Sequence, residues 1–125
     1  MSGRKIFLWM TMLALLLAAG AAPAADYKTM TAEELQALLP GKDFFLLDVH
    51  IPEQAHIAGT DAFIDFRRIR ENAHRLPADK DTKIVVYCLS GGMSRKAAHD
   101  LIAMGYTKVY DLLGGTWAFR RLPTR

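Results

Sequence analysis

The clearest strand in the sequence runs directly into a glycine-rich loop, in the stretch Lys83-Ile84-Val85-Val86-Tyr87-Cys88-Leu89-Ser90-Gly91-Gly92-Met93-Ser94. Residues 83–87 are rich in β-branched side chains, which favour a strand. Residues 97–102 then place alanine, leucine and isoleucine on one helical face, and Gly105 provides a helix stop. The pattern predicts a strand, a loop that begins at Cys88, and a helix.

The rest of the chain alternates between strand and helix patterns in the same way. A capping-box pattern at residues 31–34 begins a short helix that ends near Leu39, and the apolar run 44–48 predicts a buried strand that ends in Asp48. Further segments follow: a strand near 62–64, weak helical periodicity over 66–76, a strand at 108–112 and a terminal helix near 117–121. This order predicts an α/β fold with a central parallel sheet of about five strands and helices on both faces.

The N-terminal segment has the composition of a signal peptide. Arg4 and Lys5 precede an apolar run over residues 6–19, and the small residues Ala22-Pro23-Ala24 follow it. The run is shorter than the ~20 apolar residues that span a bilayer, so an uncleaved membrane anchor is the less favoured interpretation. We expect residues 1–24 to be a signal peptide cleaved after Ala24, residues 25–125 to form one domain, and the protein to be periplasmic or otherwise exported.

The charge balance argues against a nucleic-acid partner. The chain has 16 basic and 13 acidic side chains, and removal of Arg4 and Lys5 with the signal peptide leaves 14 basic ones. The mature domain is therefore nearly neutral, and the alkaline isoelectric point of the whole chain is weak evidence for a nucleic-acid partner. We interpret the C-terminal cluster of Arg120, Arg121 and Arg125 as a solvated tail, and we expect Trp117 and Phe119 beside it to pack in the core.

Cys88 is the only cysteine in the chain, so the protein cannot form an internal disulfide. In an α/β sheet, ligands bind beyond the carboxyl ends of the strands, where both Asp48 and Cys88 are expected. Gly91 and Gly92 allow the backbone to curl with its amide hydrogens inward, and the helix that follows adds its positive end. Such a cradle lowers the pKa of a thiol. The alternative is that the glycines only make a tight turn and Cys88 fills core space.

Four segments of the chain, in the right order, resemble the signatures of the single-domain rhodaneses, a family of sulfurtransferases. The segments are Leu46-Leu47-Asp48-Val49 with Pro52-Glu53, then His56-Ile57-Ala58-Gly59-Thr60, then Val85-Val86-Tyr87-Cys88-Leu89-Ser90-Gly91, and finally Gly105-Tyr106-Thr107-Lys108-Val109-Tyr110 with Leu113-Gly114-Gly115. The resemblance covers residues 27–121. It implies the three-layer rhodanese-like fold for the domain.

The resemblance also implies a ping-pong sulfur transfer through Cys88. The Cys88 thiolate would take the outer sulfur of a small anion such as thiosulfate, and the resulting persulfide would pass it to a thiol, to cyanide or to a protein acceptor. The backbone amides of residues 89–93 (Leu89, Ser90, Gly91, Gly92 and Met93) would stabilise the persulfide, and Ser94 would cap the helix behind them. Asp48, His56 and Arg95 are expected as supporting residues. No metal and no cofactor is required.

Two departures from the family pattern bear on how far the family chemistry carries over, the first on the anionic donor and the second on the stability of the loop. Many members have arginine at the position of Met93, where it would pair with an anionic donor, and Arg95 lies roughly on the opposite side of the helix. The arginine that commonly ends the first signature is His50 here. The four histidines, at positions 50, 56, 74 and 99, do not have the spacing of a zinc site.

Two other functions remain open from the sequence. Phosphatases and arsenate reductases with a related loop have an arginine six residues after the cysteine, whereas this chain has Ser94, so the bidentate clamp for an oxyanion is missing. A rhodanese-like module that carries sulfur or binds a partner without turnover is the second alternative. The intact Cys88 disfavours a purely scaffolding role.

Overall fold

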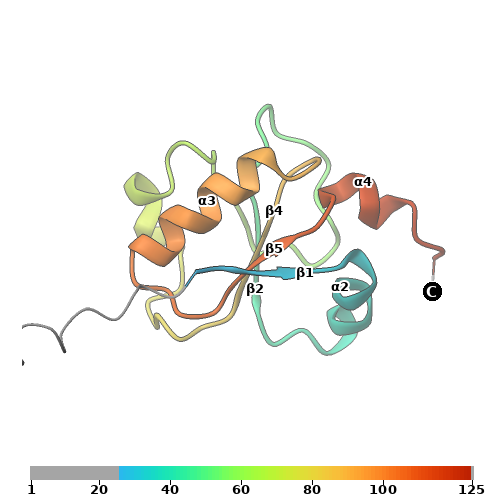
Figure 1. The fold of residues 1–125 in the computed structure, drawn as a ribbon, viewed down its shortest axis with the longest axis horizontal. Helices are drawn as coiled ribbons and strands as arrows, with labels where there is room; N and C mark the ends of the chain where they lie inside the picture. Colours follow the sequence, from blue (N-terminus) through green and yellow to red (C-terminus); the bar gives the residue numbers. More distant parts are fainter. Residues whose placement is uncertain (1–25, 125) are drawn as a thin grey trace, which may run out of the picture.

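The computed structural model describes residues 26–124, and the predicted signal peptide lies outside this range. In the described part of the chain, five strands form one sheet, and several helices pack around it (Figure 1). In chain order these elements are β1 (Lys28–Met30), α2 (Ala32–Leu38), η1 (Leu39–Gly41), β2 (Phe45–Asp48), β3 (Ala62–Phe63), η2 (Arg70–Arg75), β4 (Ile84–Tyr87), α3 (Gly92–Ala103), β5 (Val109–Leu112) and α4 (Gly115–Arg120).

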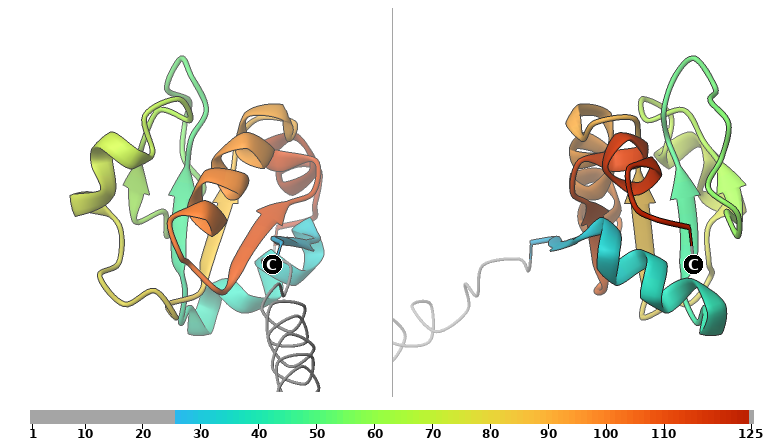
Figure 2. Two further views of the ribbon diagram at one scale, coloured as in Figure 1. Left: turned by 60° about the vertical axis from the view of Figure 1, so that its left-hand side comes forward. Right: turned by 90° about the vertical axis from the view of Figure 1, so that its right-hand side faces the viewer.

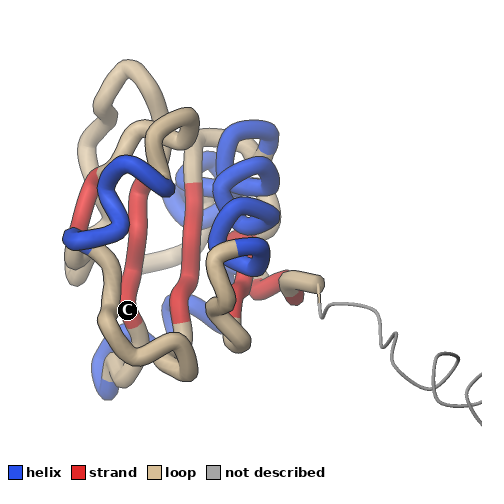
Figure 3. Tube along the Cα trace, turned by 90° about the vertical axis from the view of Figure 1, so that its left-hand side faces the viewer, coloured by secondary structure: helices blue, strands red, loops and turns tan. Residues whose placement is uncertain are grey.

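The strands form one sheet in the order β1-β5-β4-β2-β3, and every neighbouring pair is parallel. β4 lies in the middle, with Asp48 of β2 opposite Tyr87 on one side. The strands lie between helical segments (Figure 3). The carboxyl ends of β2, β4 and β5 therefore share one edge of the sheet, and the residues that follow them are placed close together.

Alternate residues of the strands build two apolar layers. On one face Val86 and Val109 pack with Ala97 and Leu101 of α3. On the other face Val85, Tyr87 and Leu112 pack with Leu35 of α2. The two faces are covered by different helices, with α2 beside α4 (Figure 2). The prediction of a parallel sheet with helices on both faces is confirmed.

The residues that begin α2 behave as the capping-box pattern predicts. The Thr31 hydroxyl accepts a hydrogen bond from the Glu34 amide at 3.1 Å, and the Glu34 carboxylate accepts one from the Thr31 amide at 3.3 Å. Pro40 lies in the short η1 turn that follows, where it ends the α-helix.

Two segments differ from the sequence prediction. The expected helix over residues 66–76 is a kinked 3₁₀ helix over Arg70–Arg75, because the Asn72 side chain donates to the carbonyl of Arg68 at 2.9 Å and competes with regular helical bonding. β1 was not predicted. Two of its three residues are exposed, so this edge strand carries almost no apolar signal.

Within residues 26–124 no helix is both long and apolar enough to cross a bilayer.

Candidate active site around Cys88

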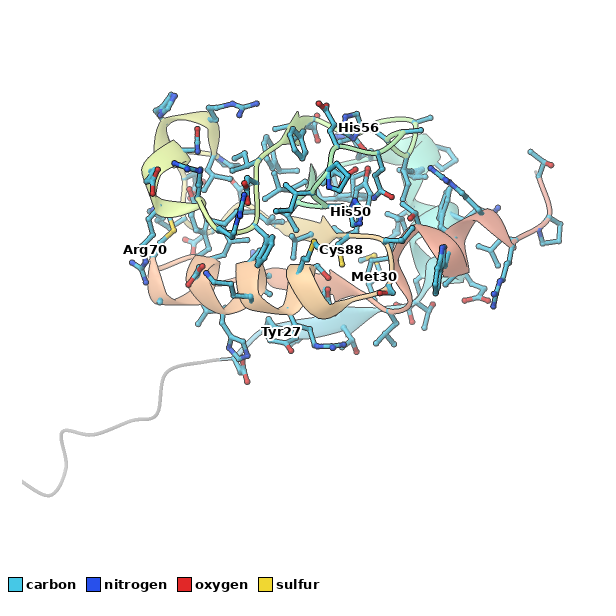
Figure 4. All side chains as sticks on the ribbon, turned by 90° about the horizontal axis from the view of Figure 1, so that it is seen from above. Tyr27, Met30, His50, His56, Arg70 and Cys88 are labelled. Carbon is cyan, nitrogen blue, oxygen red and sulfur yellow. The ribbon has the colours of Figure 1, made fainter. Side chains whose placement is uncertain are left out.

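Cys88 follows the last residue of β4 and lies at the floor of a small cavity. The cavity has a volume of about 190 Å³ and is lined by His50, Cys88, Leu89, Ser90, Gly92 and Met93. Five of these residues belong to the segment 88–93, which we call the Cys88 loop. Figure 4 shows His50 near Cys88 from the segment between β2 and β3. The Cys88 side chain is buried, with 1% of its surface exposed.

The backbone of the Cys88 loop curls around the sulfur. The Gly91 amide donates a hydrogen bond to Cys88 Sγ at 3.1 Å. Gly91 has a φ of +134°, a backbone conformation that residues with a side chain rarely adopt. An added Cβ at this position would lie 3.0 Å from Nη1 of Arg95. α3 begins at the next residue, so the positive end of this 12-residue helix adjoins the thiol and favours a negatively charged sulfur.

Ser94 does not cap α3 as expected. Gly91 occupies the N-cap position, and Ser94 is the third residue of the helix. Its hydroxyl is fully buried and lies 3.4 Å from Cys88 Sγ and 3.1 Å from the Gly91 carbonyl oxygen. It also donates a hydrogen bond to Oδ1 of Asp111 on β5. Ser94 therefore contacts the Cys88 sulfur directly instead of closing the helix end.

Asp111 is a site residue that the sequence analysis missed. It lies on β5 with only 2% of its surface exposed, and burial raises the pKa of its carboxyl, opposed by the Ser94 hydrogen bond and the charge of Arg95. A polar residue in an otherwise apolar strand was the available signal, because buried carboxylates need a partner.

The other end of the Cys88 loop is held by α4. The amides of Thr116 and Trp117 donate to the carbonyl oxygens of Cys88 and Leu89 at 3.0 and 3.1 Å. Gly115 permits this approach, since an added Cβ would lie 2.4 Å from the Cys88 carbonyl oxygen. The expectation that Trp117 packs in the core is wrong: its side chain is 56% exposed, because Gly115 and Thr116 form the buried side of this short helix. Phe119 packs against the core as expected.

Asp48 and His56 organise the segment that carries His50. The fully buried Asp48 carboxylate accepts hydrogen bonds from the His50 amide at 3.0 Å and from the Gln54 side chain at 3.3 Å, and it lies 2.8 Å from Nδ1 of His56. The pKa of His56 is raised, mainly by its hydrogen bond with Asp48 and next by a 2.8 Å contact between its Nε2 and Glu53. Asp48 and His56, the two residues predicted to support the site, thus hold the segment that carries His50 in place.

Arg95 does not line the cavity. Its side chain is exposed on α3, and its guanidinium folds back toward Gly91 at the outer side of the Cys88 loop. The structure brings Cys88, the loop residues and Ser94 together, whereas Arg95 acts on this group through its charge. Met93, at the position where many family members have arginine, does line the cavity.

The chemistry available at this site is that of a cradled thiol. Within the described residues, no group of three or more His, Cys, Asp or Glu side chains is arranged to hold a metal ion. Cys88 contributes the thiol that lines the cavity, with an amide hydrogen and a helix N-terminus directed at its sulfur. This arrangement stabilises negative charge on sulfur.

The sequence and fold comparisons place the chain in a family. Residues 31–122 match the rhodanese-like domain, and the chain belongs to the rhodanese-like family. The predicted family and the predicted three-layer fold are both confirmed.

Relatives in this family are named for sulfur transfer. The chain is 31% identical over 96 residues to thiosulfate sulfurtransferase GlpE of Coxiella burnetii, covering 73% of this chain and 87% of the relative. It is 35% identical over 92 residues to a sulfurtransferase of Allochromatium vinosum, covering 70% and 84%. A crystal structure of a rhodanese-like domain protein from Staphylococcus aureus superimposes with a TM-score of 0.64 at 26% identity, covering 74% of this chain and 90% of that one.

Proposed function

We propose that the protein is a sulfurtransferase that moves sulfane sulfur from a donor to a thiol or cyanide acceptor through a persulfide on Cys88. The observation that carries this proposal is the position of Cys88 Sγ. It lies at the cavity floor, 3.1 Å from the Gly91 nitrogen and next to the first turn of α3. The names of the relatives support the same reaction class.

The proposed reaction has two displacement steps. The Cys88 thiolate attacks the outer sulfur of the donor, so that a Cys88 Sγ–S bond forms and the sulfur–sulfur bond of the donor breaks. With thiosulfate, the electron pair of that bond leaves on sulfite. The acceptor then attacks the outer sulfur of the persulfide, and the Cys88 thiolate is the leaving group. No electrons are gained or lost overall, so no redox cofactor enters the scheme.

The cavity supports a small donor but gives it little positive charge. Met93 is neutral, and His50 is the titratable side chain that lines the cavity together with Cys88. A free dianion therefore lacks a bidentate partner in the cavity. We propose thiosulfate as a slow donor, and a persulfide presented by a thiol or by a protein as the alternative source.

A second candidate within the same chemistry is a sulfur carrier, which is loaded by one protein and unloaded by another. The cavity-lining residues include no lysine or arginine, which favours a carrier, because turnover of a free anion depends on binding that anion. Stable loading with slow turnover is the behaviour expected of a carrier.

The test is the intact mass of the purified protein before and after thiosulfate, followed by cyanide. We expect a gain of one sulfur atom that disappears with the acceptor, and no gain in Cys88→Ser. Counting thiocyanate released per protein separates an enzyme from a carrier. If thiosulfate and a small persulfide both fail to load the wild-type protein, sulfur transfer through Cys88 is wrong.

We also propose that residues 1–24 are removed on export, as the order of basic, apolar and small residues supports. The intact mass of protein recovered from the periplasmic fraction of a bacterial host should correspond to a chain that begins at Ala25. Recovery of the uncleaved chain from the cytoplasm or from membranes would contradict this.

A further inference from the structure

A buried serine and a buried carboxyl group lie behind the nucleophile, and the displacement steps do not use them. Ser94 Oγ is 3.4 Å from Cys88 Sγ and is hydrogen-bonded to Oδ1 of Asp111. At most 2% of the surface of each of these three residues is exposed. They come from three parts of the fold, the position directly after β4, the first turn of α3 and the strand β5, so the fold brings them together.

The Ser94 hydroxyl has one proton and three neighbours. Its oxygen lies within hydrogen-bond distance of Cys88 Sγ, Asp111 Oδ1 and the Gly91 carbonyl oxygen. When Asp111 is ionised, Ser94 donates to it and accepts from the Cys88 thiol. When Asp111 is protonated, the carboxyl group donates to Ser94, and the Ser94 proton is free to point at the Cys88 thiolate. The direction of the hydrogen bonds that link Asp111, Ser94 and Cys88 therefore depends on which of these groups holds the proton.

We propose that Asp111 is a positioning residue that takes up the Cys88 proton through Ser94. The S–H bond of Cys88 breaks as its proton moves to Ser94 Oγ, and the original Ser94 proton moves to Asp111 Oδ1. The product is a Cys88 thiolate that accepts a hydrogen bond from Ser94, next to a neutral carboxyl group. The reverse transfer applies when Cys88 leaves as a thiolate. The relay serves the proposed sulfur transfer, but it acts on the acidity of Cys88 and exists without any sulfur donor.

The surroundings of the three side chains suit this exchange. Burial raises the pKa of Asp111, which brings the carboxylic acid closer in energy to the thiol. The transfer moves a proton within the buried group and creates no additional charge there, so it avoids the cost of burying a second ion. The N-terminus of α3 lies next to the sulfur that becomes negative.

Other charged or titratable groups lie around Cys88, Ser94 and Asp111. Arg95 on α3 lowers the pKa of Asp111, and β1 places the uncharged Thr29 opposite Asp111. His50 lines the cavity from the β2 side. Farther from this set lie the Asp48–His56 pair, which holds the segment that carries His50, and Tyr87 on the opposite face of β4. Lys28 begins β1 at the other end of the sheet.

The experiment is the pH dependence of alkylation of the purified protein by iodoacetamide, which is neutral. The chain has one cysteine, so the rate reports the Cys88 thiolate alone. Two groups that share a proton titrate in two coupled steps. We therefore expect the wild-type rate to rise in two steps, with a lower plateau between the loss of the first proton and the loss of the shared one.

The variant Asp111→Asn keeps the shape of the side chain but cannot take up a proton. We expect a single-step profile without the lower plateau, because two coupled steps require a second titratable group. In Ser94→Ala the coupling is cut, and adding Asp111→Asn should then change the profile little. Asp100→Asn on the same helix, which removes a carboxylate paired with Lys96, should keep the two-step profile.

An identical single-step profile in the wild type and in Asp111→Asn overturns the relay. If Asp111→Asn does not fold, a two-step wild-type profile that persists in Ser94→Ala overturns it equally. Because no sulfur donor is present, a failure of persulfide loading leaves this result unchanged, and the two proposals fail separately.

Discussion

His56 Nδ1 lies 2.8 Å from Oδ2 of Asp48, a carboxylate that is fully buried at the end of β2. Because the pKa of His56 is raised from 6.5 in the folded protein, its positive charge stabilises the fold. This contribution is complete below the unfolded-state pKa and is lost as the pH rises through the higher folded-state pKa. We expect His56→Asn to lower the free energy of unfolding by about 1 kcal/mol at acidic pH and by less at alkaline pH.

Urea unfolding at about pH 5.5 and about pH 8.5, on either side of the ordinary histidine range, measures this difference. His74→Asn is the matched control, because His74 is exposed on η2. A His56→Asn deficit that is equal at both pH values would contradict the charged Asp48–His56 pair.

Tyr87 ties the β2–β3 segment to the central strand. Its buried hydroxyl accepts a hydrogen bond from the Ile57 amide at 3.0 Å and lies 2.8 Å from the Thr60 hydroxyl. Tyr87→Phe leaves the Ile57 amide without this partner, and we expect a loss of about 1–3 kcal/mol in the free energy of unfolding. Tyr110→Phe should cost less, because the Tyr110 hydroxyl makes no hydrogen bond within residues 26–124. Equal losses in the two variants would remove the proposed role of Tyr87.

Gly115 sets the distance between α4 and the Cys88 loop. In Gly115→Ala the new Cβ would lie 2.6 Å from the Leu89 carbonyl oxygen, at a φ of +55°. We expect a loss of about 2–4 kcal/mol in unfolding free energy and slower alkylation of Cys88, since backbone must shift at the loop. Gly41→Ala is the control, because nothing lies within 4 Å of its added Cβ. A Gly115→Ala protein with wild-type stability and Cys88 reactivity would contradict the close approach.

Met93 lines the cavity without contributing charge. Met93→Arg should accelerate persulfide formation from thiosulfate about tenfold at low salt, because a charge-assisted hydrogen bond to the donor is worth about 1.5–3 kcal/mol. Intact mass measured on reactions quenched at increasing times gives the rate of persulfide formation. Met93→Gln is the uncharged control of similar length and should show no salt-dependent gain. If both variants load at the same rate, charge at position 93 does not limit the use of thiosulfate.

The parts of the fold that the sequence predicts well are those with strong local patterns. β4 and α3 have a β-branched run and an apolar helical face, and both were placed correctly together with Cys88 between them. The helix predicted over residues 66–76 is a shorter 3₁₀ helix over Arg70–Arg75, because Ile69 and Leu76 are the buried apolar residues of the segment, too few to support three helical turns. β1 depends on pairing with β5, a contact that is distant in sequence.

The residues of the candidate site likewise include some that a local sequence pattern predicts and others that only the fold brings together. The cysteine and its glycine loop are contiguous in sequence, so a motif identifies them. Asp111 and Thr116 reach the loop only through the order of strands in the sheet, and Ser94 has a role that depends on Asp111. The direction of a single buried hydroxyl cannot be deduced from spacing, which explains why Ser94 was expected to be a helix cap.

The attachment of the Cys88 loop to α4 also has a consequence for biosynthesis. The amides that hold the carbonyls of Cys88 and Leu89 belong to Thr116 and Trp117, which the ribosome adds after the loop itself. β5, which carries Asp111, is likewise translated after the loop. The thiol therefore acquires its finished surroundings only once synthesis has passed Trp117, and a nascent polypeptide that stops before this residue presents the cysteine without them.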